Sequence, residues 1–287
     1  MDFAVLLKEK ILIGDGATGT ELIRLGAPAG VPGDLLNLQK PEIVSQVHRG
    51  YAEAGSNMVI TNTFGCTSIK LGKFKCADKM REINMAGVQI ARNAVPPNVL
   101  IAGDIGPIGE LLKPYGPAEP EMVKQAFAEQ VEALVEGGVD LLILETFFDL
   151  NEAILALEAA LDSGLPVIAS MTFDLKRGGA YTMMGNSASD CAKTLSQAGA
   201  TVVGANCSMT IDHMPAVAKE LKKGADVPLI LQPNAGKPEI VEGRTVYHET
   251  PENFAAKVPD LIAAGARIIG GCCGTDARFI RAIREAI

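Results

Sequence analysis

The residues best suited to chemistry are three cysteines that follow two short β-branched segments. Val202-Val203 leads into Cys207, and Ile268-Ile269 leads into the adjacent pair Cys272-Cys273. If both segments are strands of one parallel sheet, their carboxyl ends lie on the same face and the three thiolates can converge. Three thiolates form a catalytic type of zinc site with one open position, whereas a structural zinc has four protein ligands. The alternative is buried, inert cysteine, because a free cysteine packs like a small hydrophobic side chain.

Polar side chains stand at other predicted strand ends. Asn62 follows the second apolar segment, Glu145 follows the fourth, and Asn234 follows the seventh. In a parallel barrel, such residues line the active site. Glu145 comes after four apolar residues, so it requires a cationic partner or a shifted pKa. The ammonium of an amino acid would serve, and so would a structural lysine or arginine.

The first predicted strand continues into a glycine-rich loop, Gly14 to Gly19, which matches G-x-G-x-x-G. Asp34 lies about 20 residues further on, where the dinucleotide fingerprint has an acidic residue. However, Asp15 would place a carboxylate beside a pyrophosphate, and Asp34 lies in a loop-like stretch. A better interpretation is that Asp15 receives a substrate ammonium while the glycine backbone approaches closely. The structural alternative is that Asp15 or Thr18 caps a helix.

Three histidines occur in the chain, and none stands at a predicted strand end. A Ser-His-Asp or Cys-His arrangement is therefore disfavoured. The three cysteines are better interpreted as metal ligands than as nucleophiles.

Eight apolar segments alternate with helical patterns along the whole chain. They are continuous rather than alternating, as is typical of parallel strands buried on both faces. The segments are 11–13, 58–60, 99–101, 141–144, 167–169, 202–203, 229–231 and 268–269. Eight such units in 287 residues predict an α/β protein with a (β/α)8 TIM barrel. An open doubly wound sheet is the second choice, because it shares the alternation.

Glycine recurs where predicted helices end. Gly55, Gly138, Gly199 and Gly265 each precede a predicted strand, and glycine suits the left-handed C-cap of a helix. No linker or change of composition divides the chain. We therefore predict a single domain over residues 1–287.

Composition narrows the classes of partner. The chain has a formal charge of −8, which argues against nucleic acid or an anionic membrane as the main partner. It has no apolar run of about 18 residues that could span a bilayer, and its amino terminus does not resemble a signal peptide. Its six cysteines do not form a disulfide framework typical of secreted proteins. These features predict a cytoplasmic protein.

Taken together and in order, the motifs of this chain resemble the homocysteine S-methyltransferase family. The motifs are Asp15-Gly16-Ala17-Thr18-Gly19-Thr20, Thr61-Asn62-Thr63-Phe64, Gly103-Asp104-Ile105-Gly106-Pro107, Glu145-Thr146-Phe147, Asn206-Cys207, Pro233-Asn234-Ala235-Gly236 and Gly270-Gly271-Cys272-Cys273-Gly274. Each motif alone is unspecific, but the set covers essentially the whole chain. Within the family, the first motif and Gly-Asp-Ile-Gly-Pro resemble the homocysteine module of cobalamin-dependent methionine synthase more than the betaine-dependent enzymes.

This resemblance implies a (β/α)8 barrel and a role for each motif. Cys207, Cys272 and Cys273 would be the zinc ligands and the catalytic centre. For the substrate, Asp15 and Glu145 would hold the homocysteine ammonium, backbone amides near Ala17 and Thr18 would help hold its carboxylate, and Asn234 would shape the site. Asn62 is a further candidate for substrate binding.

The resemblance also implies a mechanism and a choice of methyl donor. Homocysteine would bind Zn2+ as a thiolate and attack an activated methyl group to give methionine. The donor favoured here is a methyl-corrinoid (methylcobalamin) carried by a separate protein or module. Small donors are the alternative: S-methylmethionine, S-adenosylmethionine or a betaine. An aromatic cage for betaine is disfavoured, because the chain has no tryptophan and four tyrosines.

Two alternatives belong to other classes of protein. A nicotinamide-dependent oxidoreductase would use the Gly14–Gly19 loop and require no zinc. A non-catalytic, zinc-stabilised partner module would need a fourth protein ligand, and none is evident. Unlike methionine synthase, the chain ends at Ile287 without folate, cobalamin or activation modules. Whether it is a standalone subunit or a fragment stays open at this point.

Overall fold

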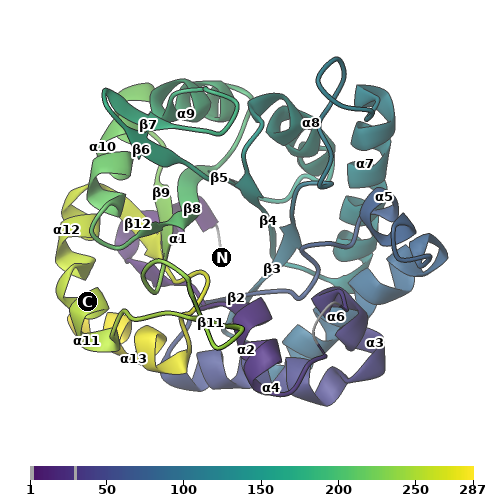
Figure 1. The fold of residues 1–287 in the computed structure, drawn as a ribbon, viewed down its shortest axis with the longest axis horizontal. Coiled ribbons are helices and arrows are strands. Elements are labelled where there is room, and N and C mark those ends of the chain that lie inside the picture. Colours follow the sequence, from purple (N-terminus) through teal and green to yellow (C-terminus); the bar gives the residue numbers. More distant parts are fainter. Residues whose placement is uncertain (1–2, 29–30) are drawn as a thin grey trace.

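The computed structural model describes residues 3–28 and 31–287, in which eight parallel strands form a nearly closed barrel inside a ring of helices (Figure 1). Neighbouring strands follow the order β1-β12-β9-β8-β5-β4-β3-β2. The strands are β1 (Leu12–Ile13), β2 (Met58–Ile60), β3 (Leu100–Ile105), β4 (Leu141–Phe147), β5 (Val167–Met171), β8 (Val202–Thr210), β9 (Leu229–Asn234) and β12 (Ala266–Ile269). The predicted (β/α)8 barrel is confirmed, and each of the eight apolar segments forms one of these strands.

Helices connect the strands and cover the outside of the barrel. The longer ones are α4 (Pro41–Ala54), α6 (Met80–Ala94), α7 (Pro120–Gly137), α8 (Leu150–Leu161), α9 (Ala188–Gln197), α10 (Met214–Gly224) and α13 (Ala277–Ala286). The shorter ones are α1 (Phe3–Glu9), α2 (Thr18–Arg24), η1 (Gly33–Leu35), α3 (Leu36–Gln39), α5 (Ser68–Gly72), η2 (Ala77–Lys79), α11 (Pro251–Ala256) and α12 (Val258–Ala263). Across the described ranges, no helix combines the length and apolar character that crossing a bilayer requires.

Two of the four predicted glycine C-caps, Gly55 and Gly138, cap α4 and α7, whereas Gly199 and Gly265 lie one residue beyond the C-caps of α9 and α12. Gly55, Gly138, Gly199 and Gly265 all have positive φ angles, between 92° and 117°. This conformation is strained for residues with a Cβ, which explains why glycine recurs where these helices turn back to the barrel.

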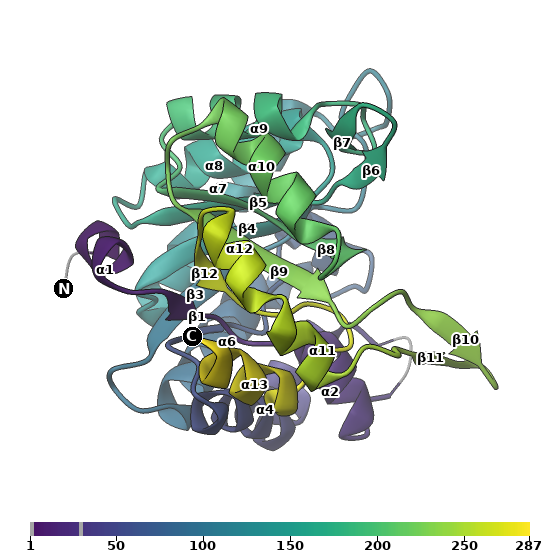
Figure 2. The ribbon, with the colours of Figure 1, turned by 90° about the vertical axis from the view of Figure 1, so that its left-hand side faces the viewer.

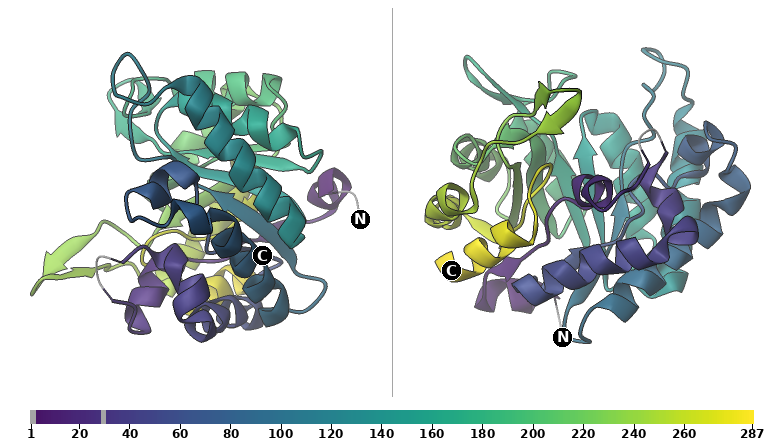
Figure 3. Two further views of the ribbon diagram at one scale, coloured as in Figure 1. Left: turned by 90° about the vertical axis from the view of Figure 1, so that its right-hand side faces the viewer. Right: turned by 60° about the horizontal axis from the view of Figure 1, so that its bottom comes forward.

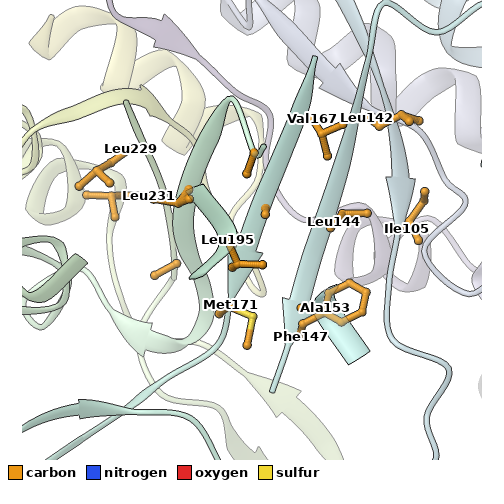
Figure 4. Packing of buried hydrophobic residues seen from close by; sticks show 14 of the residues in the cluster. Ile105, Leu142, Leu144, Phe147, Ala153, Val167, Met171, Leu195, Leu229 and Leu231 are labelled. Carbon is orange, nitrogen blue, oxygen red and sulfur yellow. The ribbon is translucent and has the colours of Figure 1, made fainter. Parts of the chain in front are cut away.

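Alternate residues of each strand pack into two separate apolar layers. One layer fills the barrel and includes Leu12, Ile143 and Ile230, and it is closed at one end by Phe3 and Leu7 of α1. The other layer lies between the strands and the outer helices, where Leu144 of β4 is near Ala153 of α8 (Figure 4). Burial on both faces accounts for the continuous apolar segments of the sequence.

Two antiparallel hairpins interrupt the alternation of strands and helices, and the sequence analysis did not predict them. The first pairs β6 (Asp174–Lys176) with β7 (Gly179–Tyr181), and the second pairs β10 (Glu239–Val241) with β11 (Arg244–Val246). Both lie toward the end of the barrel opposite α1, and β10–β11 extends well beyond it (Figures 2 and 3). They follow β5 and β9, so they stand at the carboxyl ends of the strands.

The seam between β1 and β2 is closed largely by side chains. The amide of Asn57 donates to the Ile13 carbonyl at 2.7 Å, and the Asn57 Oδ1 accepts from the Ile13 amide at 2.9 Å. The amide of Ile60 donates to Oδ2 of Asp15 at 2.7 Å. A carboxylate therefore occupies a place that a strand carbonyl would otherwise take.

Candidate active site at the carboxyl end of the barrel

A cavity of about 360 Å³ opens at the carboxyl ends of the strands, on the side opposite α1. Among the described residues, it brings together the carboxyl ends of seven of the eight strands, all except β5, and the loops that follow them. The lining residues are Asp15, Gly16, Ala17, Thr18, Gly19, Thr20, Gly33, Asp34, Ile60, Thr61, Asn62, Phe64, Asp104, Glu145, Thr146, Cys207, Gln232, Gly271, Cys272 and Cys273. All the site residues that were predicted from the sequence line this cavity, except Asn234.

The three predicted cysteine ligands meet at one side of this cavity. Cys207 comes from β8, and Cys272 and Cys273 come from the loop after β12. Their sulfur atoms all lie within 4.8 Å of one another, and the sulfurs of Cys207 and Cys273 are 3.9 Å apart. A tetrahedral zinc with Zn–S bonds of about 2.3 Å requires neighbouring sulfurs about 3.8 Å apart. The cluster therefore fits a zinc ion with three thiolate ligands and one open position.

The backbone is strained where two of the strands reach the cavity. Thr146 on β4 and Cys207 and Ser208 on β8 have positive φ angles of 64°, 59° and 48°. The strand pairing shifts register between Leu144 and Phe147, and again between Asn206 and Thr210. Such bulges redirect side chains, and strain of this kind persists only where the surroundings enforce it.

Asn206 holds this strained backbone in place. Its Oδ1 accepts from the Thr146 amide at 2.9 Å and from Ser170 Oγ at 2.8 Å, while its Nδ2 donates to Thr146 Oγ1 at 2.6 Å. The side chain is buried and spans β4, β5 and β8. These bonds fix Glu145, which precedes Thr146 on β4, and Cys207, which follows Asn206 on β8.

The cysteine cluster favours a thiolate even before a metal is considered. The pKa of Cys207 is lowered to about 3, because its sulfur accepts hydrogen bonds from Cys272, Cys273, the Ser208 amide and Asn234. Stabilised thiolates of this kind are the form that binds a metal.

Asp15 and Glu145 face the cavity without a cation. Asp15 is 1% exposed, and its Oδ1 has no hydrogen-bond partner among the described residues. Burial raises its pKa, and the charge of Glu145 raises it further. The pKa of Glu145 is raised to about 7 by removal from water and by the charge of Cys207. No ion pair to either acid occurs in residues 3–28 and 31–287. Of the two partners that the sequence left open for Glu145, the structural lysine or arginine is thus ruled out for the described residues.

Ala17 and Thr18 stand where α2 begins. The Ala17 amide already donates to the carbonyl and Oγ1 of Thr275, at 3.3 Å and 3.2 Å. Thr18 is the first residue of α2, and amides in a first helical turn have no partner within the helix. The alternative that Asp15 or Thr18 caps this helix is wrong, since Ala17 is the N-cap and no side chain caps it.

The two predicted asparagines differ in position. Asn62 lines the cavity, and its Nδ2 donates to the Gly33 carbonyl and to Asn37 Oδ1 at 2.9 Å each. Asn234 lies outside the wall but contacts Cys207, and its own Oδ1 is buried without a partner.

Several cavity residues were not predicted from the sequence to bind the substrate or a metal. Asp104 and Gln232 line the wall, and each has a buried side-chain oxygen without a partner. Asp34, which the sequence placed in a loop-like stretch, lies in η1 and also reaches the wall. Tyr247, after the β10–β11 hairpin, hydrogen-bonds Cys273. The position of Asp104 at a strand end was the one signal that could have identified it.

The barrel, the sulfur cluster and the acidic wall together define a (β/α)8 protein with three cysteines that could hold a metal ion at the carboxyl ends of its strands. A sequence model of the family described as homocysteine S-methyltransferase matches residues 12–287. The chain therefore belongs to the homocysteine S-methyltransferase family. This confirms the family resemblance found in the sequence.

Individual relatives agree with this assignment. The chain is 30% identical to methionine synthase of Mycobacterium leprae and 29% identical to methionine synthase of Mycobacterium tuberculosis. Each alignment covers 100% of this chain and 25% of the synthase, so the chain spans about a quarter of the length of these relatives. Among solved structures, the metallated form of the homocysteine methyltransferase MmuM from Escherichia coli has a TM-score of 0.83 and 26% identity, covering 99% of each chain. Its oxidized form gives a TM-score of 0.82.

Proposed function

We propose that this barrel binds homocysteine and a zinc ion and transfers a methyl group to the homocysteine sulfur, giving methionine. The observation that carries the proposal is the meeting of two features in one cavity. The first feature is a three-cysteine cluster, which would leave one coordination position of a zinc ion open. The second is a set of buried acids on the cavity wall that form no ion pair with the described residues. A substrate with a thiol and an ammonium group would bind to the metal through the first group and to the acids through the second.

The cysteines would create the nucleophile. Zinc bound by Cys207, Cys272 and Cys273 supplies a fourth position at which a thiol binds as its thiolate, the nucleophilic form. The similar structure of MmuM was solved in a metallated form, which supports metal binding in this family. The strained backbone at Cys207, fixed by Asn206, keeps that ligand in position.

The rest of the cavity would orient the amino acid. Asp15 and Glu145 hold the ammonium, and the first turn of α2 at Ala17 and Thr18 receives the carboxylate through the Thr18 amide. Asn62 closes the wall beside η1, and Asn234 fixes Cys207. Because the amino acid is anchored at its other end, its sulfur is directed to the cysteine cluster, and this orientation lowers the entropic cost of the reaction. An electron pair of the sulfur then forms the new C–S bond as the methyl group leaves its donor.

We further propose that the methyl donor is a methyl-corrinoid carried by a separate protein or module. The similarity to methionine synthases over the whole chain supports this, and so does the cavity wall. Phe64 is its one aromatic residue within the described ranges, so there is no cage for a betaine. Residues 1–287 would form a single homocysteine-binding domain that presents its open end to the donor.

A small sulfonium donor, S-methylmethionine or S-adenosylmethionine, is the second candidate. Its support is the match with MmuM, which covers 99% of both chains, so a barrel of this size forms the whole of that structure.

The test is the zinc content of protein purified under reducing conditions, followed by methionine formation. Homocysteine would be supplied with methylcobalamin in one assay and with S-methylmethionine in a parallel one. About one zinc per chain and methionine from methylcobalamin are expected. Methionine from the small donor alone would overturn the corrinoid proposal. A protein with no zinc and no methionine from either donor would overturn the function.

A further inference from the structure

The four acids of the cavity wall are not equivalent. Asp34 has partners of its own, since its Oδ1 accepts from the Gly65 amide at 2.9 Å and the charge of Lys70 stabilises its ionised form. Asp15 has one partner, the Ile60 amide, and one unpaired oxygen. Asp104 has no hydrogen bond to its carboxylate from the described residues, and its Oδ1 is buried and unpaired.

The position of Asp104 is fixed by its backbone. Its amide donates to Thr61 Oγ1 at 3.0 Å, and its carbonyl accepts from Thr63 Oγ1 at 2.8 Å and from Gln130 Nε2 at 3.2 Å. The residue is 4% exposed, at the end of β3, and it cannot turn outward without breaking these bonds. A buried acid that is held toward a cavity without a donor is costly, and proteins keep such groups where a ligand supplies the missing partner.

The nearby lysine does not supply that partner. Lys70 Nζ donates to the Pro107 carbonyl at 3.2 Å and lies over the Phe64 ring, 4.4 Å from its centroid. No ion pair between Lys70 and Asp104 forms within the described part of the chain. The charge of Lys70 favours ionised Asp104 from a distance, but a donor in contact with the Asp104 carboxylate has to enter with a ligand.

Asp104 acts together with Asp15 and Glu145. The charges of Glu145, Asp34 and Asp15 all disfavour ionisation of Asp104, and that of Glu145 does the same to Asp15. The three carboxyl groups thus face a common space from β3, β4 and the loop after β1. A primary ammonium has three N–H donors, which matches three acceptor groups.

We propose that Asp104 is the third carboxylate around the substrate ammonium and that it determines specificity for α-amino thiols over thiols without an amino group. This inference rests on the proposed function, because it names a further residue of the same substrate site. A thiol without the ammonium would leave three acids unpaired, so the wall would reject it.

The test compares two thiols that differ by the amino group, L-homocysteine and 4-mercaptobutanoate. Binding to zinc-loaded protein would be measured by calorimetry for the wild type, Asp104→Asn and the matched control Asp34→Asn. Asparagine keeps the shape of the side chain and removes its charge. Loss of a hydrogen bond to a charged group predicts that Asp104→Asn weakens homocysteine binding by about 10-fold to 100-fold. Affinity for 4-mercaptobutanoate should be unchanged or higher.

The control separates a specific effect from a general one. Asp34 also lines the cavity, but its partners are in the protein, and its charge disfavours ionised Asp104, so Asp34→Asn should not lower the ratio of homocysteine affinity to 4-mercaptobutanoate affinity. If Asp104→Asn binds homocysteine with an unchanged ratio of homocysteine affinity to 4-mercaptobutanoate affinity, the role of Asp104 is overturned, while the proposed function is not. An equal loss for both thiols would do the same. A wild type that binds neither thiol would overturn the proposed function and this inference with it.

The thermal midpoint of the same variants provides a second readout that shows whether each is folded. Homocysteine should raise the midpoint of the wild type and of Asp34→Asn, and raise that of Asp104→Asn much less at the same concentration. An equal rise in all three proteins would contradict the proposal.

Discussion

The two ends of the barrel differ in the side chains that they bury and in their backbone geometry. At the α1 end, Phe3 and Leu7 complete an apolar layer with residues such as Leu12 and Ile143. At the other end, strands bulge and non-glycine residues adopt positive φ angles. Most of the unpaired buried polar atoms in residues 3–28 and 31–287 are found there too, on Asp15, Asp104, Gln130, Gln232 and Asn234. The buried His48 is the exception.

This difference indicates that the free energy of folding and the chemistry come from separate parts of the molecule. The apolar end gains stability from burial, while the polar end retains groups that destabilise the empty protein. Substitutions at the two ends should therefore have different signatures, one in stability and the other in ligand binding.

The largest effect is expected from the cysteine cluster. Replacing Cys207, Cys272 or Cys273 with alanine removes one of three metal ligands. Methyl transfer should fall by more than the roughly 100-fold that loss of an outer partner of a metal ligand costs. Zinc content and methionine formation would be measured, with Cys191→Ala as the matched control, because Cys191 is buried in α9 away from the cavity. Full activity in any of the three variants would contradict the assignment of the ligands.

The next largest effect is expected at the opposite end. Leu7 is 1% exposed, so Leu7→Ala should lower the free energy of unfolding by about 3 kcal/mol through lost burial and a residual cavity. Urea unfolding would measure this change. Zinc stoichiometry and homocysteine affinity of the folded protein should stay at wild-type values. A specific loss of zinc in this variant would show that the two ends are coupled.

A smaller effect is expected from Asp15→Asn, which changes one charge in the wall. Homocysteine binding should weaken by about 10-fold or more, since a charged hydrogen bond is lost. Zinc content should not change, because Asp15 is not among the clustered ligands. Calorimetry and metal analysis on the same sample would check both. Unchanged affinity would remove Asp15 from the ammonium site.

The smallest effect concerns the pH dependence of the metal-free protein. Glu145 has a pKa raised from 4.5 to about 7, so in the folded state it holds its proton more tightly, and its ionisation destabilises the fold as pH rises from 4.5 to 7. Burial lowers the pKa of His48 from 6.5 to about 4, which has the opposite sign: stability falls as pH drops from 6.5 to 4.

Glu145→Gln removes the first of these contributions and leaves the second. The free energy of unfolding should then rise with pH more steeply than in the wild type, by about 2 kcal/mol between pH 4.5 and pH 7. Urea unfolding at several pH values would measure the slopes. Parallel curves for the two proteins would show that Glu145 does not titrate in this range.

Sequence reasoning succeeded where local chemistry decides the structure. Continuous apolar segments require burial on both faces, and glycine at helix ends requires a positive φ angle, so the strands and the caps of α4 and α7 could be predicted. The convergence of Cys207 with Cys272 followed from the parallel arrangement of β8 and β12.

It failed where a role depends on a missing partner or on a distant contact. Asp104 was assigned no role from the sequence, because a sequence does not show that its carboxylate lacks a donor. The positive φ angle of Thr146 depends on Asn206, which lies 60 residues away. The β10–β11 hairpin is short and exposed, and it has no apolar pattern that would mark it.

The hydrogen bond between the Ile60 amide and the Asp15 carboxylate makes the seam between β1 and β2 sensitive to whether the proposed substrate site is occupied. An amide exchanges its hydrogen with solvent deuterium only when its bond opens. At Ile60 the acceptor is a carboxylate of the proposed substrate site rather than a strand carbonyl. Protonation of Asp15 would weaken this bond, and the proposed bound ammonium, by keeping the carboxylate ionised, would strengthen it. The exchange rate of this single amide would therefore record whether the site is filled, without a label on the substrate or a reaction to follow.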